Sequence, residues 1–148
     1  MVNRGTYQNV ENYILSHFSS DKACTDEITS DIINSERVKQ YLNLHKSRFE
    51  LITNIVSIYN IPISAKILDI GTSYGVVPLY LKSMRYTVAA TELQERDEFF
   101  STHLKSKGID IKAWDINTEP PPFSSNTFDV IIAAEVLEHL QVSLYHSI

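Results

Sequence analysis

Apolar residues in the first third of the chain recur at steps of three and four positions, which is the period of an amphipathic helix. The clearest run covers residues 36–59 and places its apolar side chains in one stripe. Asn34 or Ser35 can cap the start of this helix, and Pro62 lies just beyond its end. A weaker pattern of the same kind predicts a second helix over residues 10–18. The first 62 residues are therefore expected to form a helical extension.

Beyond Pro62 the pattern changes to short apolar runs that alternate with helical stretches. The runs predict four strands, over residues 66–70, 87–91, 109–113 and 130–134. The stretches between and after them predict helices over residues 77–84, 95–107 and 137–145. Apolar strands joined by helices are typical of a parallel sheet with helices on both faces and right-handed crossovers. The sequence therefore predicts an α/β domain over residues 63–148.

Composition narrows the class of protein only slightly. The 148 residues are 43% hydrophobic and 21% charged, which suits one packed domain rather than a disordered chain. The net charge of −5 argues against a nucleic-acid partner, because such partners select a basic surface. The single cysteine, Cys24, excludes an internal disulfide, and neither a signal-peptide pattern nor a membrane span is apparent, so we expect a cytoplasmic protein.

The most informative segment is a glycine-containing turn that follows the first predicted strand. The strand ends in Asp69, and the turn contains Gly71 and Gly75 before the next helix begins. Gly71 allows a tight bend and a close approach of the backbone to a ligand, and Gly75 allows the helix to start near the strand. The N-terminus of that helix offers free N–H groups. An ordinary strand–helix loop is the alternative, but the acid and both glycines lie where a nucleotide-type ligand needs them.

Two further acids follow the second and third predicted strands. Glu92 lies about 20 residues after Gly71, a separation at which a carboxylate can accept hydrogen bonds from both ribose hydroxyls. Asp115 can accept a hydrogen bond from an adenine amino group, and its apolar neighbour Ile116 can cover the ring. A solvated strand-end charge is the alternative for Glu92, and a turn acid is the alternative for Asp115.

The fourth predicted strand is apolar throughout and is therefore expected to be buried on both faces. Its end delivers Glu135, Glu138 and His139 to the carboxyl edge of the sheet, where ligands of open α/β sheets bind. His139 is the first candidate for a general base, and Glu135 is the second. A structural or capping role is the competing interpretation of His139.

In combination, these motifs resemble the class I (Rossmann-like) S-adenosylmethionine-dependent methyltransferases of the small-molecule type, over about residues 65–140. In that family the first motif is an acid followed by Gly-x-Gly-x-Gly, and here Ser73 stands at the middle glycine. The family sheet has the order 3-2-1-4-5-7-6. This chain supplies strands 3-2-1-4 and lacks strands 5 to 7, so the resemblance implies a chain truncated after the fourth strand, whose exposed edge is a site for self-association.

The resemblance also implies S-adenosyl-L-methionine as the cofactor and a role for each motif. Asp69 and Gly71 would line the pocket of the methionine part, Glu92 would hold the ribose, and Glu135 would border the sulfonium. The full set of implied cofactor-binding residues is Asp69, Gly71, Thr72, Ser73, Gly75, Glu92, Asp115, Ile116 and Glu135.

The expected function is in-line transfer of a methyl group to an unidentified small molecule, without a metal ion. The helices between Val10 and Tyr59 would cover the cofactor cleft or pack on the sheet. A non-catalytic binding or scaffold domain, or an inactive fragment of a methyltransferase, is the alternative. A nicotinamide oxidoreductase is a distant third, because the dinucleotide fingerprint requires glycines where Ser73 and Val76 stand.

Overall fold

The computed structural model describes residues 4–19, 35–93 and 97–140. Its helices are α1 (Arg4–Ser19), α3 (Ser35–Ile58), α4 (Val76–Ser83), α5 (Asp97–Ser106) and the short 3-10 helix η2 (Leu137–His139). Its strands are β1 (Lys66–Ile70), β2 (Thr87–Glu92), β3 (Asp110–Ala113) and β4 (Val130–Ala133).

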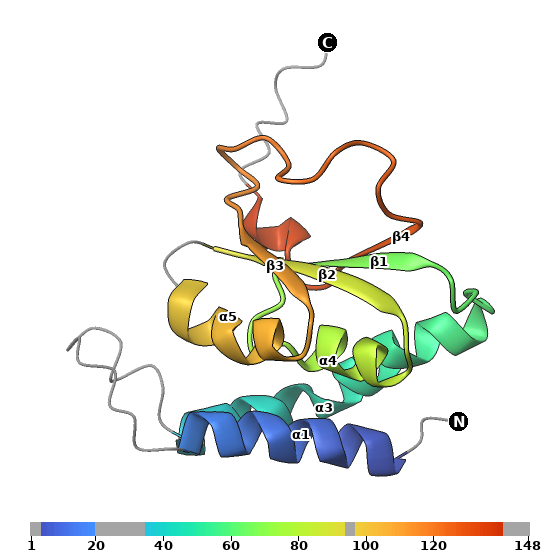
Figure 1. Ribbon diagram of the computed structural model, residues 1–148. Coiled ribbons are helices and arrows are strands. Elements are labelled where there is room, and N and C mark those ends of the chain that lie inside the picture. The colour runs from blue at the N-terminus through green and yellow to red at the C-terminus, as the bar shows by residue number, and fades with distance from the viewer. Residues whose placement is uncertain (1–3, 20–34, 94–96, 141–148) are drawn as a thin grey trace.

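The four strands form one parallel sheet in the order β3-β2-β1-β4 (Figure 1). In the register of β2, β1 and β4, Leu68 on β1 lies between Ala89 on β2 and Ile131 on β4. The predicted α/β class and the predicted order 3-2-1-4 are therefore confirmed. Because all four strands are parallel, their carboxyl ends meet at one edge of the sheet.

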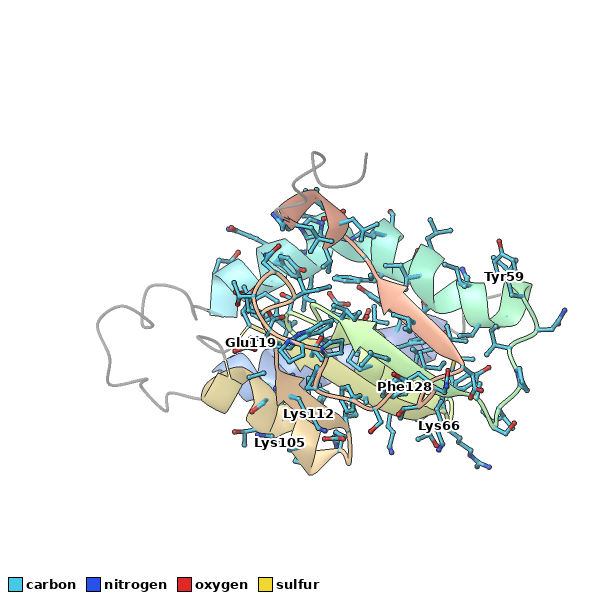
Figure 2. All side chains as sticks on the ribbon, turned by 90° about the horizontal axis from the view of Figure 1, so that it is seen from above. Tyr59, Lys66, Lys105, Lys112, Glu119 and Phe128 are labelled. Atoms are coloured by element: carbon cyan, nitrogen blue, oxygen red, sulfur yellow. The ribbon has the colours of Figure 1, made fainter. Side chains whose placement is uncertain are left out.

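The four α-helices lie on the same side of the sheet (Figure 1). Helices α4 and α5 pack directly against the strands, and α1 and α3 form a further layer beneath them. The other side is covered by the long connection between β3 and β4 and by η2. Figure 2 looks onto that side, where Glu119 and Phe128 mark the connection. Among the described residues the α-helices thus lie on one face, and the 3-10 helix η2 lies on the other.

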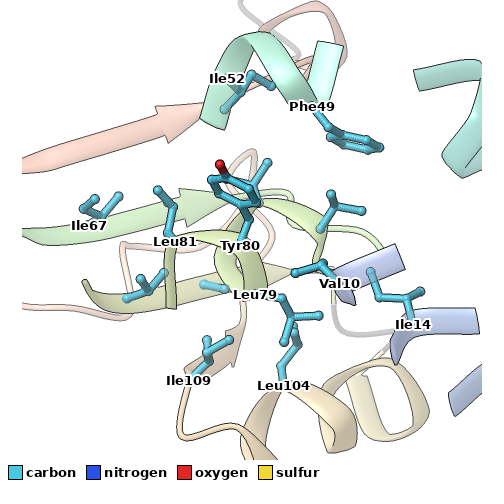
Figure 3. Close-up of a cluster of buried hydrophobic side chains, with 14 of the residues drawn as sticks. Val10, Ile14, Phe49, Ile52, Ile67, Leu79, Tyr80, Leu81, Leu104 and Ile109 are labelled. Carbon is cyan, nitrogen blue, oxygen red and sulfur yellow. The ribbon is translucent and has the colours of Figure 1, made fainter. Parts of the chain in front are cut away.

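One hydrophobic core joins the two segments that the sequence pattern separates at Pro62. Figure 3 shows side chains from α1 and α3, such as Ile14 and Phe49, in the same cluster as Ile67 on β1 and Leu81 on α4. Helices α1 and α3 therefore pack on the sheet through α4. No helix in the described part of the chain is long and apolar enough to cross a membrane.

Several element boundaries differ from those expected. Helix α1 begins at Arg4, earlier than the predicted start at Val10, and β2 extends by one residue to include Glu92. The helix predicted over residues 137–145 is described only as the 3-10 turn η2, since residues 141–148 lie outside the described part. Residues 95–96 of the helix predicted over residues 95–107 also lie outside the described part.

The prediction that the fourth strand is buried on both faces is wrong for β4. No residue of Val130–Ala133 is fully buried, and Ile131 is 62% exposed. Among the described residues β4 pairs only with β1, and Ile131 lines a pocket with Phe123 and Phe128 of the connection between β3 and β4. An apolar composition shows that a strand can be buried, but whether it is buried depends on which other segments pack over it.

The start of α4 packs against α5 at position 75, where little room is left for a side chain. Gly75 has φ +79°, and a Cβ atom there would lie 2.4 Å from Cδ2 of the fully buried Leu104. Gly108, just after α5, has a similar φ of +69°, but the nearest atom to a Cβ there is Lys82 Nζ at 3.8 Å. The two glycines therefore share a left-handed backbone and differ in the crowding that a Cβ atom would meet.

We predict that Gly75→Ala destabilises the protein more than Gly108→Ala. The shared left-handed backbone costs about 1–2 kcal/mol for a residue with a Cβ. The overlap with Leu104 adds about 1–3 kcal/mol, typical of an overpacked core. Equilibrium urea unfolding of the two variants measures the difference. Equal losses of unfolding free energy would mean that α5 moves away from Gly75 without cost.

Candidate functional site

A cavity of about 440 Å³ opens at the carboxyl ends of the strands. This volume lies within the range of ligand pockets, about 300–1,000 Å³. Its walls come from the turns after β1, β2, β3 and β4 and from one side of α3. The lining residues are Tyr41, His45, Arg48, Ile70, Gly71, Ser73, Thr91, Glu92, Leu93, Trp114, Asp115, Ile116, Asn117, Ala134, Glu135, Val136, His139 and Leu140.

The glycine turn is tied to the end of β2 by its backbone. The N–H groups of Gly71 and Thr72 both donate to Thr91 O at 3.0 Å, and the N–H of Gly75 donates to Thr72 O at 2.9 Å. Gly71 has φ +70°, and a Cβ atom there would lie 2.6 Å from Val136 Cγ2. Glycine therefore suits position 71 for two reasons: it tolerates a left-handed backbone, and its lack of a Cβ atom lets the segment after β4 approach closely.

Ser73, at the position of the middle glycine, also has a left-handed backbone, with φ +49°. Its N–H donates to Glu92 Oε2 at 2.5 Å, and the N–H of Leu93 donates to Glu92 Oε1 at 3.0 Å. The nearly buried Glu92 carboxylate is thereby held in one orientation beside the turn. Each carboxylate oxygen can accept about two hydrogen bonds, so Glu92 retains one acceptor site per oxygen.

These bonds occupy N–H groups of the turn itself, whereas the expectation of free N–H groups concerned the N-terminus of α4, which begins at Val76. The N–H groups of Gly71, Thr72, Ser73 and Gly75 all donate to protein acceptors. The reason is the parallel neighbour β2, whose last carbonyl and carboxylate groups lie within reach of the turn. An anionic group of a ligand would have to find its donor elsewhere in the cavity.

Asp69, the acid that precedes the turn, is 3% exposed and does not line the cavity. In the sheet, Asp69 on β1 lies between Ala90 on β2 and Ile132 on β4. Burial raises the pKa of its carboxyl to about 7. The Thr72 hydroxyl acts in the opposite direction, and the charge of Glu92 adds to the rise. Thr72 Oγ1 is buried and makes no aligned hydrogen bond with a described residue. Of the predicted motif, Gly71 and Ser73 face the cavity, while Asp69, Thr72 and Gly75 support the turn from outside it.

Asp115 and Ile116 line the cavity on the β3 side. Both Asp115 oxygens accept hydrogen bonds from their own loop, from Asn117 N at 2.9 Å and from Thr118 Oγ1 at 2.8 Å. These hydrogen bonds lower the pKa of Asp115. The loop is anchored to β2 by Trp114 N, which donates to Glu92 O at 2.8 Å. Asp115 thus stabilises a turn and borders the cavity at the same time.

On the β4 side the cavity is lined by Glu135 and His139, whereas Glu138 does not line it. Glu135 has a left-handed backbone, with φ +54°, and its Oε2 forms an ion pair with Arg48 Nη1. His139 belongs to η2 and is exposed. The structure therefore brings the two predicted base candidates into the same cavity as Glu92 and Asp115.

Helix α3 supplies a wall that the sequence motifs did not identify. Tyr41, His45 and Arg48 follow each other at steps of four and three residues and line the cavity together. The Tyr41 ring lies 4.5 Å from the His45 ring and 4.9 Å from the Tyr74 ring, between centroids. Burial and, secondarily, the charge of Arg48 lower the pKa of His45. Helical spacing marks one face of α3, but only packing on α4 and the ion pair to Glu135 put that face over the sheet edge.

Fold and site together define a Rossmann-like α/β protein with a nucleoside-sized cavity at the carboxyl edge of its sheet. Residues 68–145, more than half of the chain, match the family model described as a methyltransferase domain. The chain belongs to this family, whose model is that of a methyltransferase domain. A comparison with curated proteins gave no match.

Solved structures agree on the fold. A putative S-adenosyl-L-methionine-dependent methyltransferase from Methanococcus maripaludis is 19% identical, with a TM-score of 0.53 over 71% of this chain and 52% of that protein. A TehB-like SAM-dependent methyltransferase from Corynebacterium glutamicum is 21% identical, with a TM-score of 0.51 over 72% of this chain and 60% of that protein. The matches thus cover only 52% and 60% of the length of these two structures.

We predict that Asp69→Asn changes the pH dependence of stability. Asp69 has a pKa of about 7 in the folded protein against an ordinary value of 3.8. Its contribution to stability is therefore complete below about pH 4 and is lost as the pH rises through 7. Asparagine cannot ionise, so the unfolding free energy of the variant should rise relative to wild type by up to about 4 kcal/mol between pH 4 and pH 8.

Urea unfolding at a series of pH values measures this difference. Asp110→Asn, which removes an exposed carboxylate from β3, is the matched control and should leave the pH profile unchanged. Parallel profiles for wild type and Asp69→Asn would contradict the raised pKa.

Proposed function

We propose that this cavity binds S-adenosyl-L-methionine and that the protein transfers its methyl group to a small molecule. The observation that carries the proposal is the hydrogen bond from Ser73 N–H to Glu92, which joins the glycine turn to the second acid inside one cavity. Membership of the methyltransferase family supports the same assignment.

The residues present fit an adenosyl ligand. Glu92 keeps two acceptor sites for the ribose hydroxyls. On the β3 side, Asp115 would accept from the adenine amino group and Ile116 would cover the ring. On the β4 side, Glu135 would lie near the sulfonium. Gly71, Thr72, Ser73 and Gly75 would shape the turn, and Asp69 would support it from below.

When bound, S-adenosylmethionine supplies a methyl group on a positively charged sulfur that is ready to leave as a neutral thioether. An acceptor atom held in line would form a bond to the methyl carbon as the carbon–sulfur bond breaks. Alignment of this kind contributes about 7–11 kcal/mol. For a hydroxyl or other protonated acceptor, His139 would accept the proton, with Glu135 as the second candidate. Both residues line the cavity.

A non-catalytic binding domain is the second candidate function. Cofactor binding without transfer to any acceptor would distinguish this function from the first.

We predict that Glu92→Gln weakens the binding of S-adenosylhomocysteine at least tenfold. Loss of charge-assisted hydrogen bonds to the ribose costs about 1.5–3 kcal/mol. Isothermal titration calorimetry measures the dissociation constant, and Asp110→Asn, which alters an exposed carboxylate outside the cavity, should bind like wild type. Thermal unfolding of the ligand-free variant shows whether the substitution also destabilises the turn at Ser73, apart from its effect on binding. Absence of binding to the wild-type protein would overturn the proposed function.

We also propose that the protein self-associates through β4. Among the described residues the outer edge of β4 pairs with no strand, and Ile131 is 62% exposed. Unpaired strand edges are templates for association, and an added lysine blunts them. Ile131→Lys should therefore lower the mass-average molecular weight measured by light scattering as a function of concentration. Leu44→Lys, at a 78% exposed position on α3, is the control, and an equal effect of both variants would exclude β4 as the contact.

A further inference from the structure

The charges on the cavity wall are unevenly divided. Glu92, Asp115 and Glu135 contribute three acids, whereas Arg48 is the one lysine or arginine among the described lining residues. Arg48 extends from α3, and its side chain is 22% exposed. A ligand that carries a carboxylate would be repelled by three groups of this wall and attracted by one.

Four N–H groups of the glycine turn do not replace Arg48 in that role. The N–H groups of Gly71 and Thr72 donate to Thr91 O, that of Ser73 donates to Glu92, and that of Gly75 donates to Thr72 O. The turn that would otherwise cradle an anion has therefore used these donors within the protein.

The ion pair with Glu135 orients the Arg48 side chain but does not use all the N–H donors of its guanidinium. The contact joins Nη1 of Arg48 to Oε2 of Glu135, and Nη1 is buried without an aligned hydrogen bond to a described residue. A guanidinium has five N–H donors and binds a carboxylate through two of them in parallel. Glu135 is 53% exposed, so solvent screens the attraction and a second carboxylate can compete or share.

The order of the strands places Arg48 at one end of the cavity. Glu135 follows β4, Glu92 ends β2, and Asp115 follows β3, so the cavity crosses the full order β4-β1-β2-β3. With neighbouring strands about 4.8 Å apart, the span from β4 to β3 is roughly 14 Å. Such a span accommodates an extended ligand with a nucleoside at the β2–β3 end and a flexible chain reaching the β4 end.

We propose that Arg48 binds the carboxylate at the amino-acid end of the cofactor. The inference rests on the proposed function and adds a residue on α3 that no motif of the sheet domain supplies. Helix α3 thereby serves as part of the cofactor site as well as a packing element.

Two ligands that differ only at the amino-acid end test the assignment. S-adenosylhomocysteine carries the carboxylate, and 5′-methylthioadenosine keeps the adenosine and the sulfur but ends in a methyl group. Calorimetric titration of both into wild type and Arg48→Gln should show at least tenfold weaker binding of S-adenosylhomocysteine and less than twofold change for 5′-methylthioadenosine. Arg48→Lys, which keeps the charge without the planar fork, should give an intermediate loss for S-adenosylhomocysteine alone.

Lys39→Gln is the matched control, because it removes a positive charge from an exposed position of α3 that does not line the cavity. It should bind both ligands like wild type. An equal loss for both ligands in Arg48→Gln, or no loss for either, would overturn the role of Arg48 while leaving the proposed function in place. Failure of wild type to bind either ligand would instead overturn the proposed function and, with it, this inference.

Discussion

The hydrogen bond from Ser73 N–H to the Glu92 carboxylate is the contact on which the site depends. It joins the turn after β1 to the last residue of β2, at a distance of 2.5 Å. Two more bonds, from Gly71 and Thr72 to Thr91 O, reinforce the same connection. The parallel pairing of β1 with β2 makes these bonds possible, because it brings the carboxyl ends of both strands to one edge. A nearly buried carboxylate oriented in this way can meet a polar ligand without reorganising.

The backbone around the cavity contains two left-handed residues that are not glycine. Ser73 has φ +49° and Glu135 has φ +54°, on opposite sides of Gly71. Such conformations cost free energy and persist where the surrounding structure holds them. Ser73 is held by its bond to Glu92, and Glu135 is held by its ion pair with Arg48. Both positions lie on the cavity wall, whereas the other left-handed non-glycine residues among those described, Asn60, Arg85 and Asn126, lie outside it.

Helix α3 connects the packing of the molecule to its proposed chemistry. One side of α3 contributes Val38, Leu42, Phe49 and Val56 to the common core, and an adjacent side contributes Tyr41, His45 and Arg48 to the cavity. The same burial that stabilises the helix therefore fixes the position of its cavity-lining side chains. The lowered pKa of His45 is a consequence, since both burial and the neighbouring guanidinium favour its neutral form.

The resemblance to a known family implied the strand order, and the sequence pattern by itself determined the α/β class, the position of the glycine turn and the placement of acids at the strand ends. The last three features are local: hydrophobic period, glycine positions and the alternation of strands and helices are encoded in neighbouring residues. Tertiary structure alone decided that the N–H groups of the turn are already bonded, that Asp69 is buried outside the cavity, that Ile131 is exposed and that α3 forms a wall. Each of these facts depends on contacts between segments far apart in the chain, for which the pattern within one segment contains no information.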